Sequence, residues 1–159
     1  MNILKFLKPK AVIDFVYEDY TVRQAIEKMR NHGFTAVPVI GRDGGYIKTL
    51  AEGDILWFML DNNIMDIKDL EKYSISNIPK RVKNNPVYIY STIEDLILLL
   101  MNQNFVPVID DRNMFIGIIT RQDILRYCHN TLKSNLPEFE NDTEGREYRK
   151  IKEEENEYV

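Results

Sequence analysis

The sequence predicts a mixed α/β fold of the α+β class, in which two β-α-β-β-α repeats pack with pseudo-two-fold symmetry and an acidic C-terminal tail follows. Two observations lead to this prediction. Three blocks of sequence return in the same order about 70 residues later, and each copy has a threonine-capped helix pattern before a strand pair. We expect the first repeat at residues 1–72, the second at 73–133 and the tail at 134–159.

The repeat is visible in three pairs of segments. The matching pairs are Thr35–Ile40 with Asn104–Ile109 and Tyr46–Leu56 with Phe115–Leu125, each 69 positions apart, and Thr21–Ile26 with Thr92–Ile97, 71 positions apart. The second copy has therefore lost two residues between its first helix and the strand that follows. A unit of about fifty residues is too small to bury its apolar faces alone, so two units are expected to share one fold.

Each element of the unit has a local signal. A short strand leads to Thr21 or Thr92, a residue type that caps helices, and an apolar stripe of helical period follows. A β-rich segment with a central proline, a turn and another β-rich segment then predict a hairpin before the closing helix. The expected strands are Val12–Tyr17, Ala36–Ile40 and Tyr46–Leu50 in the first copy and Val87–Tyr90, Phe105–Ile109 and Met114–Ile119 in the second, with closing helices beginning near Asp54 and Asp123.

Charge is unevenly distributed along the 159 residues. The net charge is −4, but residues 138–159 hold nine acidic and four basic side chains, which leaves the remainder at +1. A protein that binds nucleic acid by neutralising phosphates needs a basic excess that this near-neutral part lacks. We therefore expect no nucleic-acid partner, and the acidity belongs to the tail.

The sequence shows neither a secretory signal nor a membrane-spanning segment. The N-terminal apolar residues are interrupted by lysines, and the longest apolar run, 96–101, is far shorter than a bilayer requires. With one cysteine, Cys128, no internal disulfide and no cysteine-based zinc site can form, and we expect a buried thiol without chemistry. These features predict a cytoplasmic protein with no metal site.

Two motifs resemble tandem CBS domains, the Bateman module. The strand motif of that family is present as Gly33–Val39, and its Gly-hydrophobic-hydrophobic-Thr-x-x-Asp motif is present in full as Gly117–Asp123. The resemblance covers about residues 6–132. More narrowly, the chain is similar to the cyclic di-AMP-binding CBS pairs of Gram-positive bacteria through Gly33–Val39, Asn77–Arg81 and Asn104–Pro107.

The second copy of the motif has the chemistry of a nucleotide site. Thr120 stands at a helix N-terminus that favours phosphate, and Arg121 can add a charged contact. The resemblance gives Asp123 the role of accepting hydrogen bonds from ribose, and the segment with Pro107 that of holding adenine. Thr-x-x-Asp is also a simple helix-capping pattern, so a purely structural role stays open. The candidate nucleotide-binding residues are Lys80, Arg81, Val82, Asn104, Phe105, Val106, Pro107, Thr120, Arg121 and Asp123.

The first copy departs from the motif. Ala51 replaces the Ser/Thr position and Lys48 replaces the glycine, so only Asp54 remains of the polar residues. Lys48 and Lys10 could compensate, although a lysine side chain is more often solvated. The residues of this candidate second nucleotide site are Lys10, Ala11, Phe34, Thr35, Ala36, Val37, Pro38 and Asp54.

The resemblance implies a regulatory module and no enzyme. We expect it to sense an adenine nucleotide (AMP, ADP, ATP or cyclic di-AMP) between the repeats, to form a homodimer and to signal to an unidentified partner protein. No catalytic residues and no cofactor acting as a catalyst are expected, because the common phosphoryl-transfer and hydrolase motifs are absent. The alternative is an interaction or scaffold protein with vestigial nucleotide sites, which Ala51 and Lys48 favour.

Overall fold

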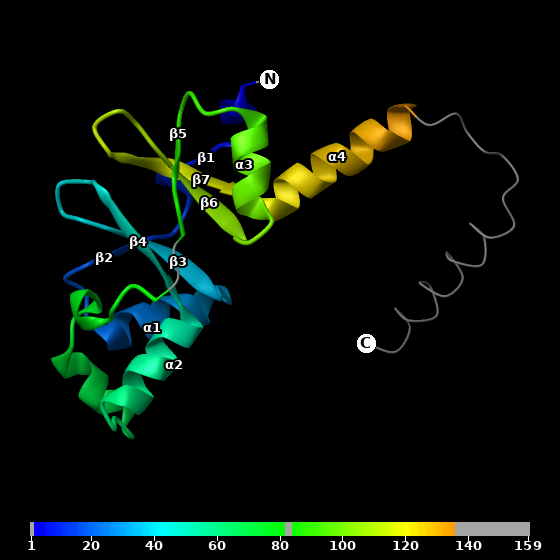
Figure 1. The fold of residues 1–159 in the computed structure, drawn as a ribbon. Coiled ribbons are helices and arrows are strands. Elements are labelled where there is room, and N and C mark those ends of the chain that lie inside the picture. Colours follow the sequence, from blue (N-terminus) through cyan, green and yellow to red (C-terminus); the bar gives the residue numbers. More distant parts are fainter. Residues whose placement is uncertain (1, 82–83, 136–159) are drawn as a thin grey trace, which may run out of the picture. The chain divides into compact units, whose positions relative to one another are not determined.

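The computed structural model describes residues 2–81 and 84–135. By its internal contacts the chain divides into two units, Met1–Ile124 and Leu125–Val159. The first unit contains every strand (Figure 1). In chain order the elements are η1 Ile3–Phe6, β1 Lys8–Pro9, η2 Lys10–Val12, β2 Val16–Tyr17, α1 Val22–His32, β3 Ala36–Ile40, β4 Tyr46–Ala51, α2 Glu52–Asp61, η3 Ile67–Lys72, η4 Ile75–Asn77, β5 Val87–Tyr88, α3 Ile93–Leu100, β6 Phe105–Ile109, β7 Phe115–Thr120 and α4 Arg121–Asn135.

The strands form two sheets, one for each repeat. The first has the order β2-β3-β4 and the second β1-β7-β6-β5. In both sheets the short entry strand runs parallel to the proline-centred strand, and that strand forms an antiparallel hairpin with the next one. Pro38 pairs with Thr49 and Pro107 with Ile118, so the two hairpins have the same register. The predicted fold of two β-α-β-β-α repeats is confirmed.

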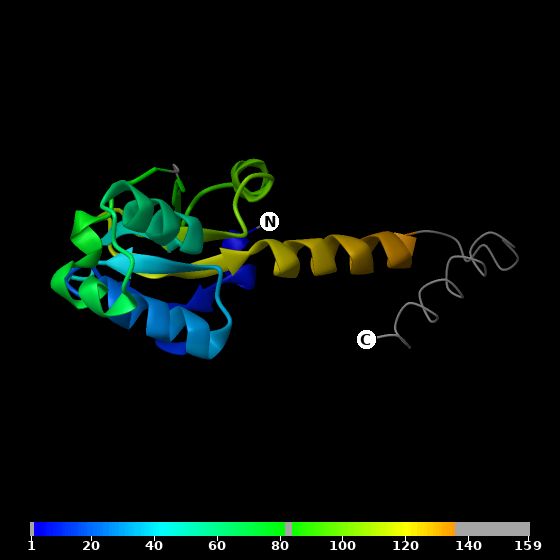
Figure 2. The same ribbon diagram turned by 90° about the horizontal axis from the view of Figure 1, so that it is seen from below.

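The first repeat packs its helices against its own sheet. The side chains of β2, β3 and β4 share one apolar cluster with those of α1 and α2. Figure 1 shows both helices beside the first sheet, and in the view of Figure 2 the strands are visible between them. Thr21 caps α1 by accepting from the backbone of Gln24 at 3.1 Å, and the side chain of Gln24 accepts from the backbone of Thr21 at 2.9 Å.

The second repeat is completed by the N-terminal residues of the chain. Its cluster contains Ile3, fully buried, together with residues of β5, α3, β6, β7 and the start of α4. Strand β1 lies at the edge of the second sheet, where Lys8 pairs with Ile118 and Pro9 with Gly117. The first residues of the chain are therefore structurally part of the last repeat.

A third apolar cluster joins the two repeats. It consists of Ile40 and Tyr46 from the first hairpin with Ile109 and Phe115 from the second. The hairpin tips also bond to each other, since Tyr46 donates its N–H to Asn113 at 3.1 Å and Phe115 donates to Gly44 at 2.9 Å. Burial of these side chains fixes the two hairpins against each other.

Two expectations from the sequence need correction, and a third falls on residues that the structure does not describe. The predicted strands at 12–17 and 87–90 shorten to β2 and β5, because each pairs only through two residues with the neighbouring strand. Cys128 is exposed rather than buried. The acidic tail, residues 134–159, lies outside the described residues from position 136 onward.

Candidate functional site

A cavity of about 370 Å³ opens between the two repeats, and we call it the inter-repeat cleft. Small-molecule pockets are usually about 300–1,000 Å³, so the cleft is large enough for a compact ligand. The first repeat and the chain before it supply the residues up to position 38, and the second repeat supplies the rest. The lining residues are Lys8, Val12, Ile13, Asp14, Gly33, Phe34, Thr35, Ala36, Pro38, Asn104, Phe105, Ile118 and Thr120.

Two residues of the cleft lining, Lys8 and Thr120, bond to the carboxylate of Asp123, which does not itself line the cleft. Lys8 Nζ lies 2.8 Å from Asp123 Oδ2, and Thr120 donates from Oγ1 to the same carboxylate oxygen at 2.5 Å. The backbone N–H of Asp123 donates back to Thr120 at 3.2 Å, so the two residues cap α4. This corner at the edge of the cleft thus combines a cation, a hydroxyl and a carboxylate at a helix N-terminus, where the helix dipole favours anions.

Gly117 explains why Lys8 lies at this corner. Strand β1 approaches β7 so closely that a Cβ at Gly117 would lie 2.2 Å from the carbonyl oxygen of Lys8. Any side chain there would push β1 away from the sheet. The glycine of the second motif is therefore required by the structure, because only a residue without a side chain leaves room for β1, the strand that contains Lys8.

The opposite wall comes from the first repeat. Asp14 bonds through Oδ1 to Lys28 Nζ at 3.2 Å and through Oδ2 to His32 Nδ1 at 3.5 Å. The rings of His32 and Phe34 are stacked, with centroids 5.3 Å apart and planes inclined by 10°. This wall offers a second carboxylate and an aromatic face across from the Lys8 corner.

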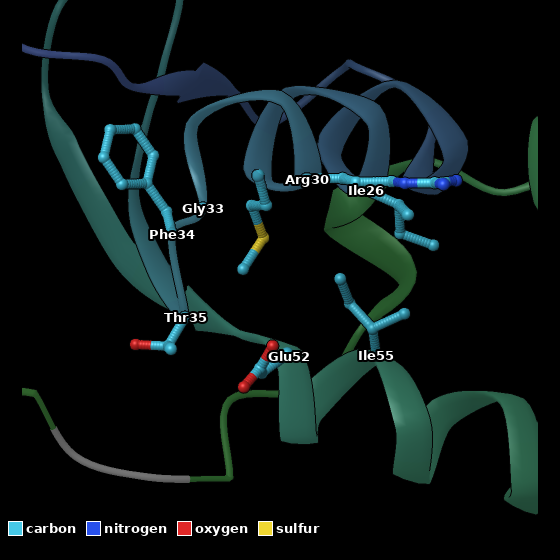
Figure 3. Close-up of a pocket in the computed structure, with 8 residues that line it drawn as sticks. Ile26, Arg30, Gly33, Phe34, Thr35, Glu52 and Ile55 are labelled. Carbon is cyan, nitrogen blue, oxygen red and sulfur yellow. The ribbon is translucent and has the colours of Figure 1, made fainter. Parts of the chain in front are cut away.

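A second cavity, of about 350 Å³, lies between α1 and α2 and is called here the helix pocket. Ile26 and Ile55 face each other across it, and Arg30 and Glu52 also line it (Figure 3). It shares Gly33, Phe34 and Thr35 with the inter-repeat cleft. The same short segment after α1 therefore borders both cavities.

The sequence assigned the candidate residues to two sites by repeat, whereas the structure brings members of both sets into one cleft. Asn104, Phe105 and Thr120 of the second set line it together with four residues of the first set, namely Phe34, Thr35, Ala36 and Pro38. This mixing follows from the packing of the two hairpins against each other. The side chains of Val37, Val106 and Pro107 are instead buried inside their sheets.

Three of the candidate nucleotide-binding residues, Arg121, Ala11 and Lys10, lie outside the lining of the inter-repeat cleft. Arg121 donates from its backbone to Asn104 at 2.9 Å and from Nε to the carbonyl of Gln103 at 3.1 Å. Ala11 is exposed within η2, and Lys10 Nζ lies 5.2 Å from the centre of the Phe15 ring. None of these three side chains lines the inter-repeat cleft.

Of the basic residues expected in the second set, Lys80 and Arg81 lie near groups of the first repeat. Arg81 forms an ion pair with Asp61 at the end of α2, and the charge of Lys80 acts on Lys48. Asp54 is buried and accepts from the backbone N–H of Ala51 at 2.8 Å. Lys80, Arg81 and Asp54 do not line the inter-repeat cleft, and Val82 lies outside the described residues.

Lys48 corrects the expectation of a solvated lysine. It is only 7% exposed, and its ammonium donates to the carbonyls of Ile75 at 2.9 Å and Ile78 at 2.5 Å. Burial lowers the pKa of this amine, while the nearby carboxylate of Asp54 acts in the opposite direction. The side chain ties β4 to the segment that leads into the second repeat.

Sequence reasoning missed two charged residues of the cleft, Lys8 and Asp14. Lys8 had a weak signal, because the dipeptide Pro-Lys at 9–10 returns as Pro-Lys at 79–80, and this marks the segment as part of the repeat. Asp14 had no comparable signal, since its role depends on contacts with α1. Among residues 2–81 and 84–135, no group of three or more potential metal-binding side chains is present.

Comparisons with known proteins agree with this architecture. A CBS domain-containing protein of Dictyostelium discoideum is 27% identical over 120 residues, covering 67% of this chain and 78% of that protein. The crystal structure of CbpB in complex with c-di-AMP superposes with a TM-score of 0.76 at 23% identity, covering 84% of this chain and 88% of the other. That of CBSX2 in complex with AMP gives 0.65 at 23% identity, covering 82% and 97%. At this identity the two structures show a shared fold.

In the described part of the chain no helix is both long and apolar enough to cross a membrane.

The family model agrees with the internal repeat. The model named CBS domain matches residues 9–61 and again residues 75–130, one match for each repeat. The protein therefore belongs to the CBS domain family, which is regulatory and non-catalytic.

Proposed function

We propose that the protein is a regulatory module that binds an adenine nucleotide (AMP, ADP, ATP or cyclic di-AMP) in the inter-repeat cleft and signals its occupancy to a partner protein. The observation that supports this most directly is the corner of the cleft, where Lys8, Thr120 and Asp123 converge at the start of α4. Solved structures with the same fold include complexes with c-di-AMP and with AMP.

Each part of a nucleotide has a matching surface in the cleft. A phosphate fits near Lys8 and the N-terminus of α4, where a cation and the helix dipole favour negative charge. The carboxylate of Asp123, which bonds to the lining residues Lys8 and Thr120, accepts hydrogen bonds and suits the ribose hydroxyls. The apolar surface of Ala36, Phe105 and Ile118 suits the flat face of a base.

The position of the cleft suggests how occupancy is transmitted. Its lining residues come from both hairpins, so a ligand contacts the two repeats at once. A ligand that fits one relative arrangement of the repeats better than another shifts the population toward it. A partner protein that recognises the favoured arrangement then responds to the ligand.

We further propose that the module acts as a homodimer through its apolar helix faces. Five apolar side chains are between 49% and 70% exposed in the single chain: Leu56, Trp57 and Leu60 of α2, Leu98 of α3, and Met101, the residue that caps the C-terminus of α3. Such apolar side chains, gathered on helices, are typical of protein–protein interfaces. Sedimentation equilibrium is expected to give twice the mass of the chain, 18.8 kDa.

A scaffold role without ligand is the second candidate, and the first repeat favours it. At the position of Thr120 that repeat has Ala51, and its lysine ammonium is already bonded to two backbone carbonyls. In this case the cleft would hold no nucleotide, and the apolar helix faces would be the working surface.

Ligand binding decides between the two candidates. We expect one of AMP, ADP, ATP or cyclic di-AMP to raise the melting temperature saturably, because a ligand that binds only the folded state stabilises it. Asp123→Asn replaces an accepting carboxylate oxygen by a donating amide nitrogen, and Thr120→Val removes the hydroxyl. Both change the side-chain volume little, and each is expected to weaken binding about tenfold or more. Asp111→Asn, at an exposed turn between β6 and β7, is the matched control and should bind normally. No rise with any of the four at millimolar concentration would contradict nucleotide sensing.

A further inference from the structure

The entry strands of the two repeats end in the same backbone turn. Tyr17 on β2 and Tyr88 on β5 each pair with the last residue of the neighbouring strand. After the first, the N–H of Tyr20 donates to the carbonyl of Tyr17 at 3.0 Å. After the second, the N–H of Ser91 donates to the carbonyl of Tyr88 at 2.9 Å. Side chains at corresponding positions of the two turns can therefore be compared directly.

In the first repeat the tyrosine ring is covered by an arginine. The guanidinium carbon of Arg42, from the turn between β3 and β4, lies 4.0 Å from the centre of the Tyr17 ring and 5.5 Å from that of Tyr20. Arg42 Nε also donates to Asp19 Oδ2 at 3.0 Å. A guanidinium held in this way uses its flat face on a ring and its N–H groups on a carboxylate. The first repeat thus supplies a cation of its own to this aromatic surface.

The second repeat has the aromatic surface without the arginine. At the position of Arg42, in the turn between β6 and β7, it has Asp111. At the position of Asp19 it has Tyr90, whose ring stacks on that of Tyr88 with centroids 5.2 Å apart and planes inclined by 6°. Both repeats therefore present two rings and one acidic side chain here, but only the first also provides the guanidinium.

The stacked pair of Tyr88 and Tyr90, called here the tyrosine surface, is open to solvent. Tyr88 is 43% exposed and Tyr90 is 70% exposed, although each ring covers one face of the other. Tyr90 also borders a cavity of about 310 Å³ that is lined as well by Glu94, an exposed residue of α3. The tyrosine surface therefore offers a flat ring face with a carboxylate beside the same cavity.

The turn between β6 and β7 adds a second carboxylate. The side chains of Arg42 and Asp19 touch in the first repeat, and the matching backbone of the second repeat places Asp111 beside Tyr90. The turn also contains Arg112, but within residues 2–81 and 84–135 no cation lies over the ring of Tyr90. The carboxylates favour a cationic partner group, and the flat ring favours a guanidinium over an ammonium.

We propose that the tyrosine surface is the docking site for an arginine side chain of a partner protein, and that Asp111 pairs with the guanidinium. Arg42 shows within the same chain how such an arginine is held. The inference rests on the proposed function only in requiring a partner protein, and it adds the chemistry of that partner. Neither tyrosine lines the inter-repeat cleft, so the docking site is separate from the candidate nucleotide site.

Selection from a displayed library of random peptides tests the proposal. The full chain is the bait, and peptides that also bind the Tyr90→Ser variant are removed in each round. We expect the peptides that remain to share an arginine. Because Tyr90 is 70% exposed, its replacement leaves the core intact, and equal melting temperatures of the variant and wild type check this.

Calorimetry with one selected peptide measures what the arginine contributes. Citrulline in its place keeps the shape of the side chain but removes its charge, and it should weaken binding about tenfold. Lysine in its place keeps the charge but lacks the flat guanidinium, and it should weaken binding about threefold.

Variants of the protein locate the site of the peptide. Tyr90→Ser removes the outer ring and should weaken binding about tenfold, whereas Tyr90→Phe keeps the ring and should bind within about twofold of wild type. Asp111→Asn removes the charge that pairs with the arginine and should weaken binding about threefold. Asp19→Asn, at the corresponding position of the first repeat, is the matched control and should bind the peptide as tightly as wild type.

Four results would overturn the proposal. They are a selection in which no peptide distinguishes wild type from Tyr90→Ser, selected peptides without arginine, a citrulline peptide that binds as tightly as the original, and a lower mass of Tyr90→Ser in sedimentation equilibrium. Proline-rich peptides would show that the rings bind a polyproline segment instead, and the lower mass would show that a second copy of the chain covers them. None of these results depends on nucleotide binding, so this inference and the nucleotide site can fail separately.

Discussion

The corner around Thr120 in the second repeat and the equivalent corner around Ala51 in the first are built on the same backbone but differ in chemistry. Both hairpins have the same register and the same irregularity, after Val39 in one and after Val108 in the other. Positions 69 residues apart therefore correspond in space as well as in sequence. The comparison teaches that duplication conserved the pairing of the strands while the side chains at the helix start diverged.

The largest divergence is Gly117 against Lys48. In the second repeat the missing side chain lets β1 approach, so that the backbone of Lys8 pairs directly with β7. In the first repeat a long side chain fills the corresponding space and bonds to the carbonyl of Ile78. A direct strand contact is thus replaced by a lysine bridge, and only the second repeat gains a strand that carries a cation into the inter-repeat cleft.

A second divergence is Tyr46 against Phe115, and the two rings stack on each other 6.2 Å apart. The additional hydroxyl of Tyr46 is buried and lies 3.0 Å from Thr49 Oγ1 and 3.2 Å from the carbonyl oxygen of Asn84, to which it donates. Burial raises the pKa of this phenol to about 12. The first repeat therefore contains a group that resists ionisation, and the second has no counterpart at that position.

Gly117→Ala tests the largest difference. The new methyl group would collide with the backbone of Lys8, so we expect a loss of about 3 kcal/mol in the free energy of unfolding, together with weaker nucleotide binding. Urea denaturation measures the first effect and calorimetry the second. Gly53→Ala is the matched control, because its nearest neighbour would be 3.9 Å away and alanine favours a helix. Equal stabilities for the two variants would show that β1 does not need the glycine.

Tyr46→Phe makes the two repeats alike at the stacked pair. In the unfolded chain the phenol ionises near pH 10, and in the folded chain near 12, so its contribution to stability is complete below pH 10 and is lost as pH rises toward 12. We expect the fall in the free energy of unfolding across this window to be smaller in the variant by roughly 2–3 kcal/mol.

The control for this pH effect is Tyr90→Phe, at a tyrosine that is 70% exposed. Denaturation at pH 9, 10, 11 and 12 should give the same decline for Tyr90→Phe as for wild type. A decline in Tyr46→Phe as steep as that of wild type would mean that the buried hydroxyl does not set the alkaline limit.

Ala51→Thr restores to the first repeat the hydroxyl of the second and has the smallest expected effect. The backbone of Ala51 is extended, at φ −103° and ψ 155°, and accommodates threonine, while its side chain makes no capping hydrogen bond. A cap for α2 is expected to add about 0.5–1 kcal/mol to the free energy of unfolding. Ala51→Val has the same shape without the hydroxyl, so a gain shared equally by both variants would exclude capping as its cause.

Much of the fold could be predicted from the sequence, because its signals are local. Thr21 caps its helix through the backbone of Gln24, and the proline-centred segments form the strands that their composition indicates. The entry strands were overestimated, since their length depends on how many residues find a partner across the sheet. The family and its regulatory, non-catalytic character were also correctly predicted from the repeated motifs.

The sequence motifs could not predict which residues line the inter-repeat cleft. A motif groups residues within one repeat, whereas the cleft joins Thr35 of one hairpin to Thr120 of the other. The burial of Lys48 could not be predicted either. Its ammonium bonds to the backbone carbonyls of Ile75 and Ile78, and backbone groups leave no recognisable pattern in the sequence. Contacts between distant segments decided both cases.

The pairing of β1 with β7 also has a consequence for how the chain folds. Lys8 and Ile118 are 110 positions apart, so forming this ladder closes a loop that includes most of the structured chain. Closing so long a loop costs considerable chain entropy, and contacts of this range slow folding. Residues 8–9 are synthesised more than a hundred residues before their partner strand β7. A fluorescent probe near Pro9 should therefore report the last step of folding.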